Sequence, residues 1–480
     1  MMDEDHVRET DAFVLRVQDL MTKDVVVCSP QQTIQEVAQK MMHHQVSSVI
    51  VMEGNQQIGI ITERDMVNRV VAVNNKAQGY ASSIMTRDPI TISHFAFYYE
   101  ALSLMLLKGI KHLLVTEKQR LVGIITLPDL LRKKNENMLK IIRRIENADV
   151  ESLPQVKVAI YEVLEMLLNE KIPIVDTLSV ITTLYDRLMK QAVFLAIRCL
   201  EEEEGMTLPV KFNLYTMGSA GRGEQFMLTD QDHFLVYEEH DMADSYFQML
   251  GEKIVLFLER AGYERCKGLM MSSEAQWRGT ILKWKWRVHK WASVPTNDHL
   301  LLASNFFSYR LVYGDNHLHE QFQKEISEVV QTAKLFLYHL AANELKHPIK
   351  KMNHSLLSLF KLSRKSIDMK KEILFPYHHS LQILSLIHNI HIGTPFERLD
   401  ALMAKKVLEP ELVKDLKEAI NQMLSFYVRM RWQQAKTSAA SSTILSFHLL
   451  TPREKEELAI SLMILKEMQN KIFYHFNMKV

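Results

Sequence analysis

The spacing of apolar residues changes several times along the 480-residue chain. Residues 33–43 and 97–108 carry apolar positions at helical spacing, and two apolar runs typical of strands follow each stretch. Helical spacing returns over 156–168 and 180–200. After about residue 325 it predicts four further helices, at 335–345, 383–390, 412–432 and 454–474. The pattern therefore predicts a multidomain fold, α/β in its first part and all-α towards the C-terminus.

The first quarter of the chain contains an internal repeat. Residues 19–22 (Asp-Leu-Met-Thr) return as 83–86 (Ser-Ile-Met-Thr), and Gly-Ile-Ile-Thr at 59–62 returns at 123–126; both pairs are offset by 64 positions. Each unit is expected to form a short strand, a helix, two strands and a last helix that begins near an aspartate. Self-similarity of this kind indicates a duplicated structural unit.

The amino-acid composition limits the classes of protein to which the chain can belong. The chain is 47% hydrophobic and 24% charged with a net charge of +1, which is ordinary for a globular protein and gives no electrostatic reason to expect nucleic acid or a membrane surface as partner. We expect no membrane span, because no apolar run is long enough. Three scattered cysteines and an acidic N-terminus favour a reducing, cytoplasmic setting.

Residues 215–237 combine a glycine-rich turn with two alternate carboxylates. A strand is expected at 233–237, so Asp230 and Asp232 should share one face. Two acids on one face repel unless a cation lies between them, and Mg²⁺ or Mn²⁺ is the usual partner of such oxygens. An ordinary hairpin with solvated acids is the alternative.

The turn before these acids has residues suited to phosphate. Gly218 and Gly221 allow a tight bend close to a ligand, Ser219 supplies a hydroxyl, and Arg222 supplies a forked cation. Together with the two aspartates, these residues predict a magnesium nucleotide site.

The order Gly-Ser-x-x-Arg-x-Glu followed by Asp-x-Asp resembles the nucleotidyltransferases of the polymerase-beta-like superfamily, in the branch similar to the PII-protein uridylyltransferases. The resemblance implies an α/β domain with a mixed sheet and transfer of a nucleoside monophosphate from a nucleoside triphosphate to a hydroxyl, with release of pyrophosphate. Asp230 and Asp232 would be the catalytic metal ligands. Gly218, Ser219, Arg222 and Glu224 would form the phosphate-binding turn, in which Glu224 fixes the turn.

One position departs from this branch. Where the family has an aspartate in Phe-Phe-Asp-x-Arg, this chain has Ser308. A hydroxyl near neutral pH is a poor metal ligand and a poor base. A catalytically weak or inactive nucleotide-binding signalling protein therefore remains the alternative to an enzyme.

The repeat resembles a tandem pair of CBS domains, the Bateman module, with a βαββα unit in each half. The resemblance implies that Thr62 and Asp65, or Thr126 and Asp129, bind AMP, ADP or ATP as regulatory ligands. It also implies a homodimer formed through the pair. Capping of a helix by the same Thr and Asp side chains is the alternative.

These inferences predict four parts. They are a CBS pair at 14–134 (14–75 and 78–134), a helical connector at 135–205, a nucleotidyltransferase domain at 206–324, and a helical C-terminal bundle at 325–480. The expected partners are nucleotides and a protein or small-molecule acceptor. A tryptophan-rich segment at 277–291 is expected to pack in the core, with one or two of its cations reaching the triphosphate.

Overall fold

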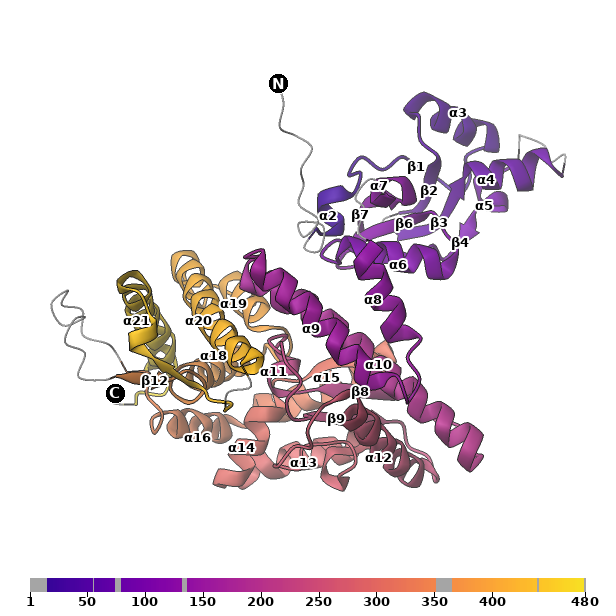
Figure 1. Ribbon diagram of the computed structural model, residues 1–480. Coiled ribbons are helices and arrows are strands. Elements are labelled where there is room, and N and C mark those ends of the chain that lie inside the picture. The colour runs from indigo at the N-terminus through magenta and orange to yellow at the C-terminus, as the bar shows by residue number, and fades with distance from the viewer. Residues whose placement is uncertain are drawn as a thin grey trace. The chain divides into compact units, whose positions relative to one another are not determined.

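The computed structural model describes residues 15–54, 56–73, 79–131, 136–350, 365–437 and 440–478. The chain divides into two compact units, Met1–Arg143 and Arg144–Val480, each described here by itself (Figure 1). None of the helices in the described ranges has the length and hydropathy needed to cross a bilayer.

The first unit contains the two expected repeats. The first repeat consists of α2 (Val17–Leu20), β1 (Val27–Cys28), α3 (Ile34–His44), β2 (Ser48–Glu53), β3 (Gln56–Thr62), α4 (Glu63–Met66) and the π-helix η1 (Val67–Val71). The second consists of α5 (Ala81–Ile84), β4 (Thr86–Arg87), β5 (Thr91–Ser93), α6 (Tyr98–Lys108), β6 (His112–Glu117), β7 (Arg120–Thr126) and α7 (Leu127–Leu131). Two sheets result, with strand orders β1-β2-β3-β4 and β5-β6-β7.

The duplication extends to strand register. Ser48 pairs with Thr62 in the first repeat, and His112 pairs with Thr126 in the second. The register shifts at the equivalent place in both hairpins, between Val51 and Met52 and between Val115 and Thr116. Since a one-residue slip would turn every buried side chain outward, equal registers mean that both repeats bury the same positions.

Local sequence accounts for where the first long helix begins. Thr33 accepts a hydrogen bond from the Glu36 amide, and the Glu36 carboxylate accepts one from the Thr33 amide, so the helix start is satisfied from both sides. Ile34, Val37 and Met41 then lie on the buried face. The prediction of a helix over 33–43 is confirmed.

A four-stranded mixed sheet forms the centre of the second unit. Its strand order is β10-β9-β8-β11, with β8 and β9 antiparallel and β9 and β10 parallel. All five residues of β8 and of β9 are buried. The strands are β8 (Phe212–Thr216), β9 (His233–Tyr237), β10 (Arg278–Thr280) and β11 (Arg310–Gly314). The helices around them are α11 (Gly218–Gly221), α12 (Ala243–Ala261), η2 (Ala275–Trp277), α13 (Ile281–Ser293), α14 (Asn297–Phe306) and α15 (Asn316–Thr332).

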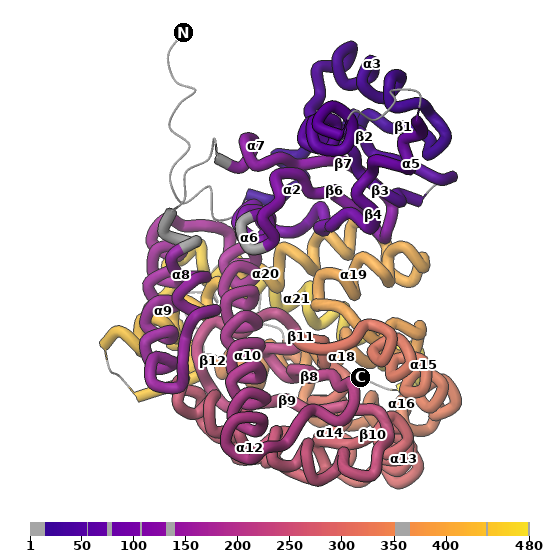
Figure 2. The backbone as a smooth tube through the Cα atoms, turned by 90° about the vertical axis from the view of Figure 1, so that its right-hand side faces the viewer, coloured from indigo at the N-terminus to yellow at the C-terminus, as the bar shows by residue number. Residues whose placement is uncertain are grey.

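In the described part of the chain, three helices immediately precede the sheet in sequence, and the last of them, α10, contacts strand β11. They are α8 (Glu136–Glu146), α9 (Leu153–Asn169) and α10 (Ile174–Glu204), and Figure 2 shows α10 running past β8 and β9. Asp186 of α10 accepts two hydrogen bonds from Arg310 of β11, at 2.5 and 2.9 Å. The Tyr161 hydroxyl accepts a hydrogen bond from the Leu228 amide, and the Tyr185 hydroxyl donates one to the Phe226 carbonyl. These contacts fix the loop that carries the two aspartates.

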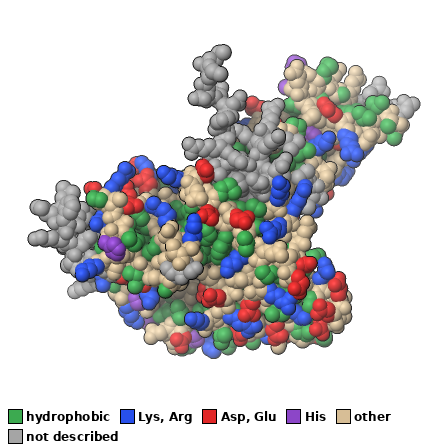
Figure 3. Space-filling model, in the orientation of Figure 1, with side chains coloured by type: hydrophobic (Ala, Val, Ile, Leu, Met, Phe, Trp, Pro, Cys, Tyr) green, Lys and Arg blue, Asp and Glu red, His purple; other side chains and the backbone are tan. Residues whose placement is uncertain are grey.

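The C-terminal part is helical, as predicted. Its elements are α16 (Lys334–Glu344), the π-helix η3 (Lys370–Leu374), α18 (Phe375–Ile387), α19 (Pro395–Ala404), α20 (Pro410–Lys436), the short 3₁₀ turn η4 (Phe447–Leu449) and α21 (Pro452–His475). A two-stranded sheet of β12 (Ser366–Asp368) and β13 (Ile444–Ser446) was not predicted, because three-residue strands are too short to show alternation. On the face of the second unit drawn in Figure 3, acidic and basic side chains are interspersed.

Candidate active site

The glycine turn follows β8 and lies against one of the two aspartates. Gly218 has a positive φ of 58°, and a Cβ there would lie 2.9 Å from Asp232 Oδ2. Glycine is therefore required both by the backbone conformation and by the approach of the carboxylate. The backbone closes the turn with hydrogen bonds from the amides of Gly221 and Arg222 to the carbonyls of Met217 and Gly218.

The two predicted metal ligands come together as expected, and a third group joins them. Asp230 is exposed and Asp232 is partly buried. A β-bridge between Asp230 and Glu264 places Cys266 beside them, and one ligand atom from each of Asp230, Asp232 and Cys266 lies within 4.8 Å of the others. Sequence reasoning missed Cys266, because nothing in its local sequence indicates which strand its segment approaches.

The electrostatics of the two acids favour a cation. Burial and then the charge of Asp230 raise the pKa of Asp232 to about 6. Among the residues that the structure describes, neither Asp230 nor Asp232 has a basic side chain within ion-pair distance. A divalent ion would supply the missing positive charge, and the two carboxylates suit Mg²⁺ or Mn²⁺ better than the neutral thiol of Cys266 does.

Acidification should weaken ion binding at this pair. With its pKa raised to about 6, Asp232 takes up a proton at a pH where an ordinary aspartate is ionised. Proton and cation compete for the same oxygens, so Mn²⁺ affinity measured by calorimetry should fall up to about tenfold per pH unit below pH 6 and change little between pH 7 and 8. A pH-independent affinity in this range would contradict the assignment of Asp232 as a ligand.

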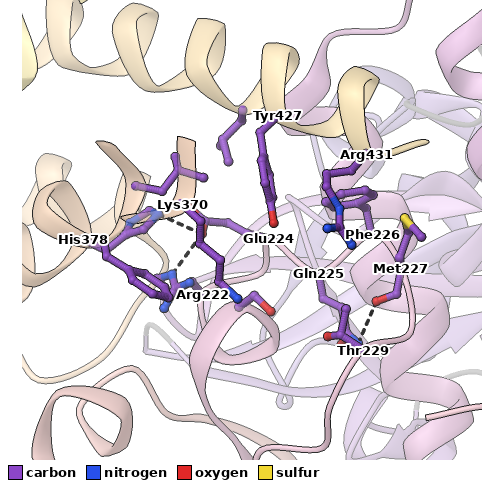
Figure 4. Close-up of a pocket in the computed structure, with 14 residues that line it drawn as sticks. Arg222, Glu224, Gln225, Phe226, Met227, Thr229, Lys370, His378, Tyr427 and Arg431 are labelled. Atoms are coloured by element: carbon purple, nitrogen blue, oxygen red, sulfur yellow. Dashed lines mark hydrogen bonds and ion pairs between the residues drawn. The ribbon is translucent and has the colours of Figure 1, made fainter. Parts of the chain in front are cut away.

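Arg222 and Glu224 form a buried ion pair beside the turn. Arg222 Nε lies 2.9 Å from Glu224 Oε2, and His378 Nε2, from α18, lies 3.0 Å from the same oxygen (Figure 4). Burial lowers the pKa of His378, and the charge of Glu224 opposes this shift. Glu224 thus links the turn to the C-terminal helices, a contact that sequence reasoning did not foresee.

Ser308 lies beneath the glycine turn. Its hydroxyl accepts a hydrogen bond from the Gly218 amide at 2.9 Å and donates one to the Asn305 carbonyl at 2.6 Å. Asp315 is occupied elsewhere, since it caps α15 through the Leu318 amide and pairs with Lys211. Ser308 thus supports the turn.

Three of the four tryptophans in the segment 277–291 pack in the core, as predicted, whereas Trp286 is 63% exposed. Trp277, Trp284 and Trp291 are buried, and Trp284 Nε1 donates a hydrogen bond to the Leu235 carbonyl at 2.9 Å. The cations of this segment bind protein groups: Arg287 donates to the carbonyls of Ala275 and Arg278, and Lys285 pairs with Glu325.

The four predicted nucleotide-binding residues of the first unit form two equivalent helix starts. Asp65 Oδ2 accepts hydrogen bonds from the Thr62 amide at 2.9 Å and the Thr62 hydroxyl at 2.7 Å. Asp129 Oδ2 accepts the same two bonds from Thr126, at 3.0 and 2.5 Å. Both carboxylates therefore bond the Thr that precedes their helix, which realises the capping alternative. The second oxygen of Asp65 pairs with Arg69 Nε at 3.4 Å.

Comparison with known families accounts for most of the chain. Residues 17–72 and 81–136 match the CBS domain. Residues 159–298 match the family described as "Putative nucleotidyltransferase DUF294", and residues 334–476 match the "Putative nucleotidyltransferase substrate binding domain". The chain belongs to the CBS-domain proteins and joins its CBS pair to a DUF294 nucleotidyltransferase domain and the associated substrate-binding domain.

Curated relatives match the CBS region. The CBS domain-containing protein YhcV of Bacillus subtilis is 33% identical over 25% of this chain and 86% of its own length. Protein MK0525 of Methanopyrus kandleri is 39% identical over 24% of this chain, and the chain spans only 61% of that relative's length. Inosine-5'-monophosphate dehydrogenase of Methanocaldococcus jannaschii is 32% identical over 27% of this chain and 26% of the relative.

Solved structures also match this region. A conserved protein from Pyrococcus horikoshii is 31% identical, with a TM-score of 0.24 over 25% of this chain and 92% of its own. The CBS domain protein PAE2072 from Pyrobaculum aerophilum, solved in complex with AMP, is 25% identical, with a TM-score of 0.24 over 26% of this chain and 96% of its own.

Proposed function

We propose that the second unit is a magnesium-dependent nucleotidyltransferase similar to the PII uridylyltransferases, and that the CBS pair regulates it in the cytoplasm. The observation that carries the proposal is the contact between the glycine turn and Asp232. A phosphate-binding turn and a carboxylate pair without a basic partner in the described residues meet at one place. This juxtaposition suits a triphosphate bound together with a divalent ion.

In the proposed reaction an acceptor hydroxyl attacks the α-phosphorus of a nucleoside triphosphate. The new O–P bond forms as the bond between the α-phosphorus and its bridging oxygen to the β-phosphate breaks, and pyrophosphate leaves. Asp230 and Asp232 would hold Mg²⁺ or Mn²⁺, which would supply charge stabilisation at the phosphates. Ser219 and Arg222 would orient the phosphates, and Gly218 lets the turn approach Asp232.

The proton of the attacking hydroxyl needs an acceptor, and Ser308 is not suited to that role because its hydroxyl is bound under the turn. This observation supports the second candidate function, a weakly active or inactive nucleotide-binding signalling protein. The two candidates agree on nucleotide binding and differ in turnover.

Transfer from α-labelled triphosphates separates the two candidates. The protein is incubated with each of the four labelled nucleotides and Mg²⁺ or Mn²⁺, in the presence of candidate protein and small-molecule acceptors. Label in an acceptor with matching pyrophosphate release supports the transferase. Tight nucleotide binding without transfer to any acceptor supports the signalling protein.

The CBS pair is proposed to bind an adenine nucleotide at Thr62 and Asp65 or at Thr126 and Asp129. Calorimetric titration with AMP, ADP and ATP should give saturable binding. Loss of a charge-assisted hydrogen bond costs about 1.5–3 kcal/mol, so Asp129→Asn or Asp65→Asn should weaken that binding roughly tenfold or more. Asparagine keeps an oxygen to cap the helix, which separates ligand loss from unfolding. Unchanged affinity in both variants would contradict the assignment.

A homodimer through the CBS pair is part of the same proposal. Val67, Val71 and Tyr80 of the first unit have 56%, 74% and 59% of their surface exposed. Burial of such side chains against a second copy would remove apolar area from water. Light scattering of the full chain tests this, and a monomer at micromolar concentration would contradict it.

A further inference from the structure

A cavity lies between the glycine turn and the C-terminal helices. On one side it is lined by the segment from Ser219 to Thr229, and on the other by side chains from η3, α18 and α20 (Figure 4). Arg222, Lys370 and Arg431 bring three cationic side chains to its wall. The cavity therefore joins the proposed phosphate site to the part of the chain that matches the substrate-binding domain.

The turn by itself has little positive charge to offer a triphosphate. The charge of Arg222 is neutralised by Glu224, whose side chain is only 8% exposed. The Gly218 amide already donates to Ser308. A bound triphosphate carries several negative charges, which one divalent ion does not balance. Additional cations are therefore needed at this site.

Lys370 and Arg431 are placed to supply them. Among the residues that the structure describes, Lys370 has no carboxylate within ion-pair distance, and it is near enough to Asp232 for its charge to oppose the rise in the pKa of that carboxyl. Arg431 Nη1 donates to the Ser441 hydroxyl, whereas its Nε is buried without a hydrogen-bond partner in the described part of the chain.

An orphaned acceptor faces the same space. Glu224 lines the cavity, and its Oε1 is buried with no hydrogen-bond partner among the described residues. An unpaired buried carboxylate oxygen costs free energy unless a bound group or water satisfies it. An ionised phosphate has no donor for this oxygen, so among these unpaired groups it is the Arg431 donor, and not the Glu224 acceptor, that an anionic ligand would satisfy.

We infer that Lys370 and Arg431 bind the phosphates of the donor nucleotide across the cavity, so that the triphosphate site is shared between the glycine turn and the C-terminal helices. This inference rests on the proposed function, because it assigns the phosphate ligand to the same site. Lys370, beside Asp232, would contact the phosphates nearest the metal ligands. Arg431, on α20, would contact the far end of the chain.

The test uses inorganic tripolyphosphate with Mg²⁺, because this probe does not depend on the base. Lys370→Gln and Arg431→Gln in the full chain are each expected to raise its Kd, measured by calorimetry, about 10-fold to 100-fold. Lys371→Gln is the matched control, since Lys371 is the exposed neighbour on the same π-helix and does not line the cavity. Its Kd should stay within about twofold of wild type. Lys370→Arg should restore most of the affinity.

The outcomes separate this inference from the function on which it rests. The inference is overturned if both glutamine variants bind tripolyphosphate as tightly as wild type does. It is also overturned if wild type does not bind tripolyphosphate. If transfer activity exists and the KM for the nucleotide is unchanged in both variants, the inference fails while the proposed function stands. If the glutamine variants lose binding but wild type transfers nothing, the inference stands and the transferase proposal fails. Unchanged thermal unfolding temperatures show that the variants are folded.

Discussion

Asp232→Asn is expected to abolish nucleotidyl transfer and to stabilise the metal-free protein. Removing one of two carboxylate ligands should lower kcat/KM by on the order of 10³-fold or more, about 4 kcal/mol of transition-state stabilisation. The stability effect has the opposite sign, because burial and the charge of Asp230 raise the pKa of Asp232 to about 6. An ionised Asp232 is thus unfavourable in the folded, metal-free state at pH 7.

The sign of the pH dependence follows from linkage. A carboxyl whose folded pKa lies above its unfolded value destabilises the folded state at pH values above the folded pKa, and the penalty disappears as the pH falls towards the unfolded value. In EDTA at pH 7, Asp232→Asn should therefore raise the free energy of unfolding by on the order of 1 kcal/mol, and this gain should vanish near pH 4. Chemical denaturation at both pH values measures it.

Asp241→Asn is the matched control, because Asp241 is an exposed aspartate just beyond the end of β9. It should change neither transfer nor stability appreciably. Full transfer activity in Asp232→Asn would remove the proposed metal site from the mechanism. Loss of activity combined with a lower stability in EDTA would mean that Asp232 acts as a structural residue.

The sequence predicts those features of the fold that depend on local pattern. The sequence Gly-Ile-Ile-Thr occurs at 59–62 and again at 123–126, and this recurrence identifies the repeat, because a duplicated unit keeps similar residues at a fixed offset. The capping box at Thr451 and Glu454 likewise predicts the start of α21, since both partners lie within one turn. Strand β9 follows from an unbroken apolar run.

Contacts between distant segments could not be predicted in the same way. Cys266 reaches the two aspartates only because its segment pairs with the one that contains Asp230, and His378 reaches Glu224 only because α18 packs against the turn. Neither residue carries a local signal, since a lone cysteine and a histidine in an apolar helix are ordinary. The residues of the motif are therefore predictable from the sequence, whereas the positions of Cys266 and His378 at the site depend on tertiary packing.

Within the glycine turn, some features follow from the local sequence and others depend on contacts with distant segments. The motif predicts that Gly218 and Gly221 are needed for a tight bend, and the structure gives each a separate reason. Gly218 has positive φ and faces a carboxylate, whereas Gly221 packs against the backbone of Ser308. Ser308 thus contacts both glycines, with its backbone carbonyl against Gly221 and its hydroxyl on the Gly218 amide.

Gly221→Ala is expected to disrupt the site by a backbone clash. A Cβ at this position would lie 1.9 Å from the Ser308 carbonyl oxygen and 3.0 Å from the Thr216 carbonyl oxygen, and neither atom belongs to a flexible side chain. Either the glycine turn or the backbone at Ser308 must shift. Overpacking of this kind costs about 1–3 kcal/mol or more, and a displacement of about 1 Å at a reacting group can reduce turnover about 100-fold.

Gly268→Ala is the matched control for this substitution. Gly268 lies near Cys266, has no positive φ, and an added Cβ would meet only the flexible Met270 side chain at 3.4 Å and Cys266 Sγ at 3.6 Å. Thermal unfolding and tripolyphosphate binding should both be impaired in Gly221→Ala and nearly normal in Gly268→Ala. A Gly221→Ala protein with normal stability and normal phosphate binding would mean that the turn is not held against Ser308. The shared role of these two residues beneath the phosphate site would then have to be abandoned.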